Sequence, residues 1–284
     1  AVAAMHGAGG SSIGFCTSYT NGFSANMNIE AFDYCLSHNN FIPNNYKNTN
    51  LKEVKYLGYI NDYKFDKTNA EAQDLRKKLK FYGAKYIIGF FDQGSVKNDI
   101  FYLYTHEISK IGYEFLIKKV IENDDFGLII KPKKPKLLKE KLGKIYPMLQ
   151  KAKATNRCFV FESHDEKHVK NFKDIPAKIA KASDLTIHDT LMAGTAGLES
   201  ALVGTKSVFF DYYKSKNNQF EEKGLNIVFR NWNLLWEEIE KDYKKKSDNL
   251  GNWEKIIDKF DSFRDGRANI RIMDFINKLK EKNY

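Results

Sequence analysis

The stretch that decides the fold runs from Ser183 to Asp211 and reads SDLTIHDTLMAGTAGLESALVGTKSVFFD. Leu185 to Ile187 is a short apolar run typical of a buried strand. Residues 194–197 then open a segment whose apolar residues follow helical spacing. Gly204 is suited to end that helix, and the apolar run 207–210 predicts the next strand. Strand, turn, helix and strand in this order predict a layer of parallel α/β structure.

The turn before the helix has the composition of an anion site. Backbone N–H groups and the positive end of a helix dipole, placed at the carboxyl end of a strand, attract phosphate. We therefore expect Gly194, Ala196 and Gly197 to bind a nucleotide through their backbone and Thr195 through its hydroxyl. Glu199 follows on the same helical face, where a carboxylate can accept both hydroxyls of a ribose. The stretch alone leaves open that these glycines serve only the turn and the packing of the helix.

This run resembles the nucleotide-binding segment of two-domain glycosyltransferases of the GT-B type. It is similar to bacterial surface-polysaccharide enzymes, including the CDP-glycerol glycerophosphotransferases and the surface carbohydrate biosynthesis proteins. In the former an Asp-Tyr-Ser-Ser pattern follows the strand. Gly194 and Thr195 take the two serine positions here, and Glu199 takes the acidic position after them. The loop that includes His188 is longer than in that pattern, which leaves the identity of the activated donor open.

The resemblance implies an α/β, GT-B-like fold with two Rossmann-like parallel-sheet domains. We expect residues 1–84 to form the acceptor-side domain and residues 85–262 the domain that binds the nucleotide donor. Residues 263–284 are expected to form a helix that crosses back to the first domain. The chain opens with an apolar run and not with methionine, so a truncated first domain is one interpretation.

Further strands and helices follow from the same periodicity arguments. The predicted strands are 32–37, 54–60, 85–91, 126–130, 158–161 and 226–229. The predicted helices are 71–81, one capped by Thr105, one through Leu138, Leu142, Ile145 and Leu149, 175–182, one from Trp232 and one after Ala268.

Composition limits the class of protein. The 284 residues are 42% hydrophobic and 14% aromatic, which is enough for a packed core in one or two domains. No run approaches the roughly 20 apolar residues of a membrane span, and the regions of a signal peptide are lacking at the N-terminus. Three widely spaced cysteines argue against a zinc site or a disulfide framework. We therefore expect a cytosolic protein without a bound metal, with the inner face of the bacterial membrane as an alternative location.

The net charge of +10 implies an acidic partner. Lysines cluster at 131–144 and at 241–246. Nucleic acid is not expected, because arginines with interleaved aromatics and a recognisable binding module are both lacking. Peripheral association with an anionic membrane stays open, as does the simpler interpretation that the lysines are solvated helix faces.

Two residues are candidates for catalysis. In the enzymes that the chain resembles, a His-Gly dipeptide at a strand end carries the base that deprotonates the acceptor hydroxyl, and this implies that role for His6 before Gly7. Imidazole suits the task because its ordinary pKa is about 6.5. Lys131 stands where those enzymes have an Ile-Lys-Pro-Lys sequence, and its charge can pair with donor phosphate. The alternatives are a histidine in a flexible loop and a solvated lysine before a proline turn.

Other candidates rest on position, because loops at the carboxyl ends of parallel strands line the ligand crevice. They are Gly9, Gly10, Ser11, His38, Asp92, Glu162, Ser163, His164 and His188.

The resemblance thus implies a glycosyltransferase, or a polyol-phosphate transferase, of bacterial surface polysaccharide synthesis, such as that of capsule or lipopolysaccharide. Its donor would be linked to CMP, CDP or UDP, its acceptor would be a glycan or a lipid-linked molecule, and it would use no cofactor. Two alternatives remain. One is a UDP-sugar 2-epimerase, which shares the fold and a similar motif. The other is a non-catalytic domain that binds acidic glycan or lipid through its basic face.

Overall fold

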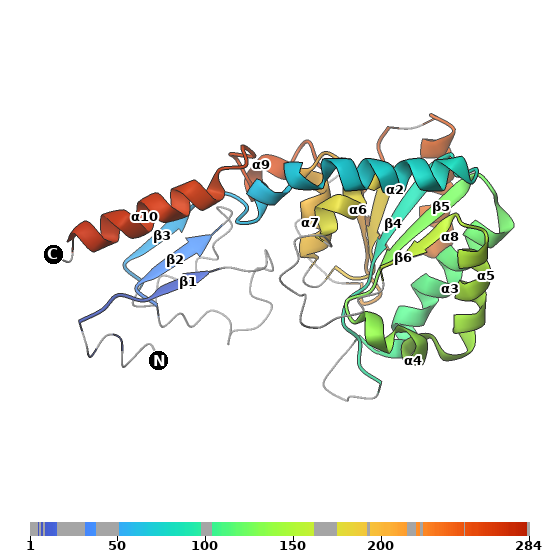
Figure 1. Cartoon of the computed structure of the whole chain (residues 1–284), viewed down its shortest axis with the longest axis horizontal. Helices are drawn as coiled ribbons and strands as arrows, with labels where there is room; N and C mark the ends of the chain where they lie inside the picture. The colour runs from blue at the N-terminus through green and yellow to red at the C-terminus, as the bar shows by residue number, and fades with distance from the viewer. Residues whose placement is uncertain are drawn as a thin grey trace. The chain divides into compact units, whose positions relative to one another are not determined.

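The computed structural model describes residues 5, 7, 9–15, 32–37, 51–97, 104–161, 175–191, 194–214, 220–221, 224–246 and 248–282. The chain divides into two compact units, one of residues 1–67 with 254–284 and one of residues 68–253 (Figure 1). These limits differ from the expected boundaries at 84 and 262. The first helix after the boundary buries Ala72, Leu75 and Leu79 in a core of the larger unit, which is why it joins that unit.

The described residues of the larger unit form a six-stranded sheet in the order β6-β5-β4-β7-β8-β9, with every pair parallel. The strands are β4 Tyr86–Phe91, β5 Phe126–Lys131, β6 Cys158–Val160, β7 Leu185–His188, β8 Lys206–Phe210 and β9 Val228–Phe229. The order reverses between β4 and β7. This is the topological switch point of a doubly wound sheet, where ligands bind outside the carboxyl ends of the strands.

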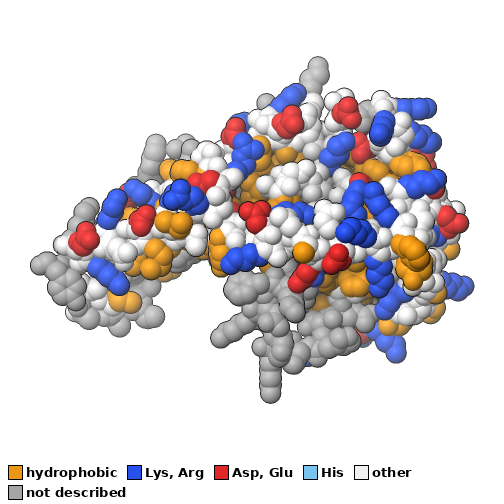
Figure 2. Space-filling model, turned by 45° about the horizontal axis from the view of Figure 1, so that its top comes forward, with side chains coloured by type: hydrophobic (Ala, Val, Ile, Leu, Met, Phe, Trp, Pro, Cys, Tyr) orange, Lys and Arg blue, Asp and Glu red, His pale blue; other side chains and the backbone are white. Residues whose placement is uncertain are grey.

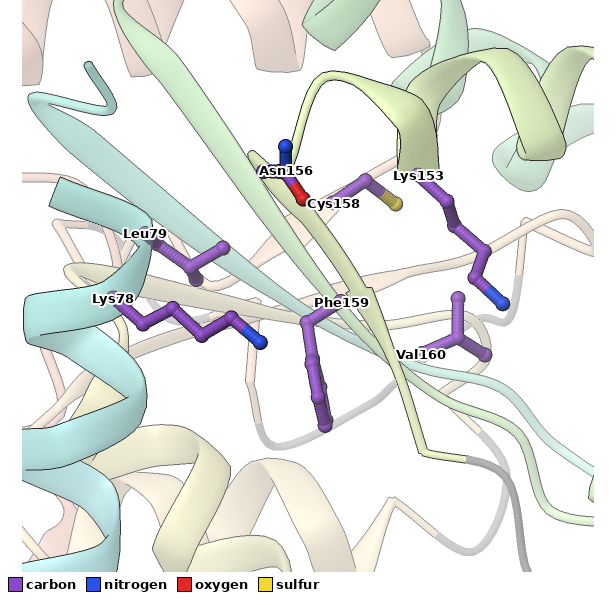
Figure 3. A pocket seen from close by; sticks show the side chains of 7 residues that line it. All are labelled: Lys78, Leu79, Lys153, Asn156, Cys158, Phe159 and Val160. Carbon is purple, nitrogen blue, oxygen red and sulfur yellow. The ribbon is translucent and has the colours of Figure 1, made fainter. Parts of the chain in front are cut away.

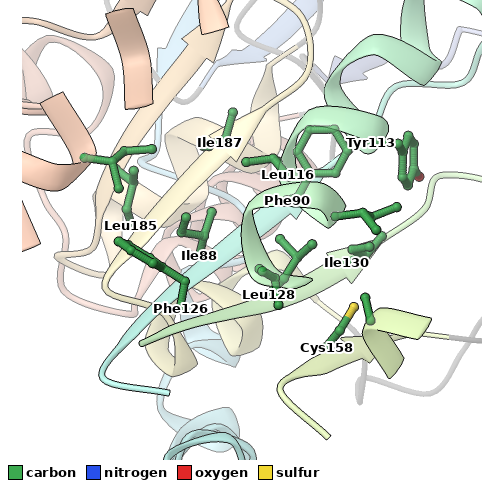
Figure 4. Packing of buried hydrophobic residues seen from close by; sticks show 14 of the residues in the cluster. Ile88, Phe90, Tyr113, Leu116, Phe126, Leu128, Ile130, Cys158, Leu185 and Ile187 are labelled. Carbon is green, nitrogen blue, oxygen red and sulfur yellow. The ribbon is translucent and has the colours of Figure 1, made fainter. Parts of the chain in front are cut away.

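Helices cover both faces of this sheet. One face is covered by α2 Asn69–Phe81, α6 Pro176–Ala182 and α7 Thr195–Leu202. The other is covered by α3 His106–Glu122, α4 Leu138–Leu142, α5 Tyr146–Ala154 and α8 Trp232–Tyr243. Side chains alternate along β4. Ile87 enters the core under α2, α6 and α7. Ile88 and Phe90 enter the core under α3, α4, α5 and α8 (Figure 4). The continuous apolar runs of the sequence are therefore strands buried on both faces.

One predicted helix is wrong. The sequence between Leu138 and Leu149 was expected to form a single helix, but it forms α4, a 3₁₀ turn at Gly143–Ile145 and α5. Gly143 has a positive φ of 52°, and Pro147 lies in the first turn of α5, where its missing N–H costs nothing. Apolar spacing continues across this break because both helices pack on the same face of the sheet.

In the smaller unit the described residues form a parallel sheet in the order β1-β2-β3, with β1 Ile13–Phe15, β2 Tyr34–Ser37 and β3 Glu53–Tyr56. The helix α10, Ala268–Lys282, packs Phe275 and Leu279 on this sheet, and the short α9, Ile257–Phe260, precedes it. The strand expected over 54–60 ends earlier, before Gly58 with its φ of 83°. Among the helices of the described residues, none is long and apolar enough to cross a membrane.

Candidate nucleotide-binding site

Two aspartates lie side by side at the switch point. Phe91 and His188 are partners in the register of β4 and β7, and Asp92 and Asp189 follow them directly. The N–H of Asp189 donates to the carbonyl of Phe91 at 2.9 Å, which extends the ladder by one residue. Both aspartates are buried. Two carboxyl groups buried from solvent therefore lie at the carboxyl edge of the sheet, where a ligand is expected to bind.

The carboxylate of Asp92 forms a buried ion pair. Lys141 Nζ of α4 lies 2.6 Å from Asp92 Oδ2, and the hydroxyl of Tyr113 of α3 donates to the same oxygen at 2.7 Å. The backbone N–H of Lys133 donates to the other carboxylate oxygen. These contacts join the end of β4 to the loop after β5 and to two helices. We infer that Asp92 fixes the shape of the edge.

Asp189 is held by hydroxyl groups. Tyr104 donates to Oδ2, Tyr212 donates to Oδ1 at 2.7 Å, and Ser109 approaches Oδ2 at 3.4 Å. Burial raises the pKa of Asp189 well above its ordinary range, against the opposing effect of the tyrosine hydroxyls. Ser109 also lies 3.4 Å from Lys141 Nζ, so the contacts of the two aspartates form one network. Burial thus acts against ionisation of Asp189, whereas the network of hydroxyl donors acts for it.

His188 is neutral in this setting. Its side chain is 3% exposed, and Nδ1 lies 2.7 Å from the carbonyl of Thr190, to which it donates. Burial lowers the pKa of His188 to about 4. His188 therefore supplies no positive charge for a phosphate near neutral pH, and its contact with a ligand stays a prediction.

The helix predicted after the turn at Gly194 begins at Thr195, as α7. Gly194 is the N-cap residue, and its carbonyl accepts the N–H groups of Gly197 and Leu198 at 3.0 and 3.2 Å. The first N–H groups of a helix point out of its end and away from the helical hydrogen bonds. Here they belong to Thr195 and Ala196, which are half-buried. Their binding to a phosphate stays a prediction.

Gly197 and Glu199 point into the protein, and the structure gives each of them a structural role. A Cβ on Gly197 would lie 2.6 Å from the ring of Phe209, so glycine lets α7 approach β8 closely. Glu199 is 4% exposed, and its Oε1 accepts the N–H of Ala177 at 2.7 Å. Glu199 thus caps the N-terminus of α6, a helix with no side-chain bond from its own N-cap residue. The expected bond from Glu199 to a ribose stays a prediction.

The N-terminus of α3 is a part of the edge that sequence analysis did not select. Thr105 caps the helix as predicted, with its hydroxyl oxygen 3.4 Å from the N–H of Ile108. His106 Nδ1 lies 2.7 Å from the hydroxyl oxygen of Ser95 in the loop after β4. Burial and the charge of Lys141 lower the pKa of His106. The only signal in the sequence was that His106 and Ser95 flank the same predicted strand-to-helix connection.

The remaining candidates divide between the two units. Lys131 is the last residue of β5 and the register partner of Phe91, so it lies on the same edge as Asp92. Gly9, Gly10 and Ser11 precede β1 in the smaller unit, where the N–H of Gly10 donates to the carbonyl of Met5 at 2.9 Å. Five further candidates lie outside the described residues, namely His6, His38, Glu162, Ser163 and His164.

Comparison with known proteins identifies the fold of the chain. No protein-family model matches the chain, and no curated protein sequence matches it. HepE of Anabaena, solved in complex with UDP and glucose, is 13% identical with a TM-score of 0.56, over 97% of this chain and 74% of HepE. The wall teichoic acid polymerase TagF is 16% identical with a TM-score of 0.52, over 89% of this chain and 59% of TagF. The chain has the GT-B fold. The expected resemblance to surface-glycan enzymes is thereby confirmed at the level of the fold.

Proposed function

We propose that this protein is a nucleotide-dependent glycosyltransferase of bacterial surface-glycan synthesis, with its donor at the carboxyl edge of the larger unit. One observation carries this proposal. The turn at Gly194 and Thr195, chosen from sequence as an anion site, opens a helix directly beside the switch point of the sheet. The fold shared with HepE and TagF supports it, and so does the presence of UDP and glucose in the HepE structure.

The electrostatics of the edge suit a negatively charged leaving group. The ion pair of Asp92 with Lys141 and the raised pKa of Asp189 both reduce the negative charge behind it. The N–H groups of Thr195 and Ala196, the Thr195 hydroxyl and the dipole of α7 would bind the donor phosphates, and Lys131 would add a charge. By analogy with oxyanion holes, each well-placed donor contributes roughly 3 kcal/mol to stabilising the developing charge.

The chemistry would be a direct transfer. The acceptor hydroxyl would attack the activated carbon of the sugar, or the phosphorus of a polyol-phosphate donor, while His6 takes its proton. The bond to the nucleotide breaks, and the nucleotide leaves with the bonding electrons. We propose a CMP-, CDP- or UDP-linked donor, a glycan or lipid-linked acceptor, no cofactor, and a cytosolic location at or near the inner face of the membrane.

A nucleotide screen by thermal shift tests the donor site. A ligand at about 100 times its Kd adds about 2.7 kcal/mol to the free energy of unfolding. We expect CMP, CDP, UDP or one of their sugar or polyol conjugates to raise the melting temperature. Thr195→Val should weaken that binding severalfold, whereas Thr195→Ser, which keeps the hydroxyl, should retain it.

The proposal is wrong if no nucleotide shifts the melting temperature of the wild-type chain, or if Thr195→Val binds the ligand as tightly as wild type. Incubation of the sugar nucleotide without acceptor is the matching control on the reaction, because an epimerase converts it and a transferase requires the acceptor.

A further inference from the structure

A pocket of about 290 Å³ lies at the outer edge of the large sheet (Figure 3). Its wall is β6, the edge strand of the described sheet, with Lys78 of α2 on one side and Lys153 of α5 on the other. Asn156 and Phe159 also line the pocket. The pocket belongs entirely to the larger unit, and its described lining shares no residue with the candidate nucleotide-binding site.

Among the described residues of the lining, two are lysines and none is acidic. Lys78 Nζ lies 6.0 Å from the centroid of the Phe159 ring, so its charge is held over an aromatic face. Burial raises the pKa of the Cys158 thiol to about 12, so this side chain carries no negative charge at neutral pH. Two ammonium groups and an amide in a pocket of this size match a phosphate group.

An aromatic tip adjoins the pocket. Phe81 is 83% exposed, more than any other large hydrophobic side chain among the described residues, and Tyr82 is 43% exposed. The centroids of their rings lie 5.2 Å apart in an edge-to-face arrangement. Phe81 is the last residue of α2 and Tyr82 its C-cap residue. They follow Lys78 by three and four positions, which puts them near its side of the helix. A Cβ on the next residue, Gly83, would lie 4.0 Å from Arg157 Cδ, beside Asn156 of the pocket.

The charge around the tip is positive. Lys77 and Lys80 are exposed on the same helix. Of the neighbouring acidic groups, Asp124 pairs with Arg157 and Asp125 with Lys85. Asp74, one turn before Lys78 on α2, is exposed and is outnumbered by Lys77, Lys78 and Lys80. Figure 2, which brings the top of Figure 1 forward, shows Lys and Arg side chains among exposed hydrophobic ones on this face of the larger unit. Exposed aromatics flanked by lysines are the pattern of surfaces that lie in a membrane interface.

We propose that this pocket and the Phe81–Tyr82 tip together bind an anionic phospholipid at a membrane surface. Lys78, Lys153 and Asn156 hold the phosphate of the headgroup, and the two aromatic rings enter the interfacial layer. The proposal does not depend on the donor site. It adds a surface, with its own ligand, to the function proposed above.

Flotation of the full chain with lipid vesicles tests this surface. We expect binding to vesicles of phosphatidylcholine with phosphatidylglycerol and little binding to phosphatidylcholine alone. Lys78→Glu and Lys153→Glu should each lower the partition coefficient at least about fivefold, since one lysine near an anionic surface contributes about that factor. Phe81→Ser and Tyr82→Ser should each lower it severalfold. The controls Lys118→Glu and Leu234→Ser, which change exposed residues of α3 and α8, should bind as wild type.

The proposal is overturned if the wild-type chain does not bind the anionic vesicles, or if the four pocket and tip variants bind them as well as the controls do. Glycerol phosphate serves as a soluble competitor. Binding of glycerol phosphate to the pocket without vesicle binding would indicate a soluble phosphate ligand and would also overturn the proposal. Each variant is first checked by thermal melting and by the nucleotide shift, which should match wild type. If nucleotides do not shift the melting temperature of the wild-type chain, that result would contradict the proposed transferase function and not the proposed lipid site.

Discussion

Lys141 Nζ and Asp92 Oδ2 lie 2.6 Å apart, and the two side chains are only 4% and 1% exposed. A buried ion pair of this kind holds its elements in place more than it adds stability, because both charges have lost their hydration. Here it joins α4 to the end of β4, beside the switch point. The hydroxyl of Tyr113 on the same carboxylate oxygen adds α3 to this junction.

Removal of one member of the pair should be costly. We expect Lys141→Met to lower the free energy of unfolding by about 3–5 kcal/mol, because it leaves the Asp92 charge buried without its partner. The double variant Lys141→Met with Asp92→Leu should lose much less than the sum of the two single variants. Urea unfolding measures each value, and Lys139→Met, at an exposed neighbouring position, should stay within about 0.5 kcal/mol of wild type. Additive losses in the double variant would contradict this prediction.

His188 should make the protein less stable in acid. Its pKa is about 4 in the folded chain and about 6.5 in the unfolded chain. As the pH falls from 6.5 to 4, the unfolded chain takes up a proton that the folded chain does not, so stability is lost, up to roughly 3 kcal/mol. His188→Gln should lack this component. The measurement is urea unfolding across this pH range for both chains. An NMR titration in which the His188 ring protonates near pH 6.5 would refute the prediction.

Asp189 should make the protein less stable as the pH rises, which is the opposite of the effect of His188. Its pKa in the folded chain is raised above the unfolded value of about 3.9, so above that pH the unfolded chain releases a proton that the folded chain keeps. The contribution of Asp189 to the free energy of unfolding is therefore complete at low pH. It is lost as the pH rises from about 4 through the pKa of Asp189 in the folded chain. Asp189→Asn is uncharged in both states and should gain stability relative to wild type over this rise. A difference between the two chains that stays constant with pH would argue for an ionised Asp189.

Gly197→Ala tests the packing of α7. Alanine normally favours a helix over glycine by about 1 kcal/mol, but here its Cβ would lie 2.6 Å from the Phe209 ring. We expect a net loss of about 1–3 kcal/mol in the free energy of unfolding from this overpacking. Adding Phe209→Leu should restore part of it. Gly94→Ala, whose Cβ would make only ordinary contact with Lys133, is the matched control for chemical denaturation. An unchanged free energy of unfolding for Gly197→Ala would contradict this prediction, because α7 would then move away from β8 without loss of stability.

Much of the larger unit could be predicted because its signals are local. The apolar run at 86–91, within the strand expected over 85–91, and the stripe of Leu235, Trp236 and Ile239 in α8 are buried as expected. Thr105 caps α3, and Gly204 has the positive φ that ends α7. Burial on both faces of a sheet, helical spacing and turn chemistry are all visible within about ten residues, which is why these elements were found.

The contents of the site could be predicted only in part, because its contacts join residues far apart in the chain. Asp92 was selected for its place after a strand, but its partner Lys141 looked like one of many surface lysines. The hydroxyls of Tyr104 and Tyr212 reach Asp189 from 85 and 23 residues away. Sequence spacing does not show which loops meet at an edge.

The cap that Glu199 provides has a consequence for the order of folding. The helix α6 has seven residues, too few to be stable alone, and its N-terminal Ala177 is bonded by a carboxylate that lies 22 residues later in the chain. This bond forms only when α7 has docked. We therefore expect the amide of Ala177 to gain protection from hydrogen exchange late in refolding, together with the amides of α7. The helix α6 would then become stable only after α7 has packed against it.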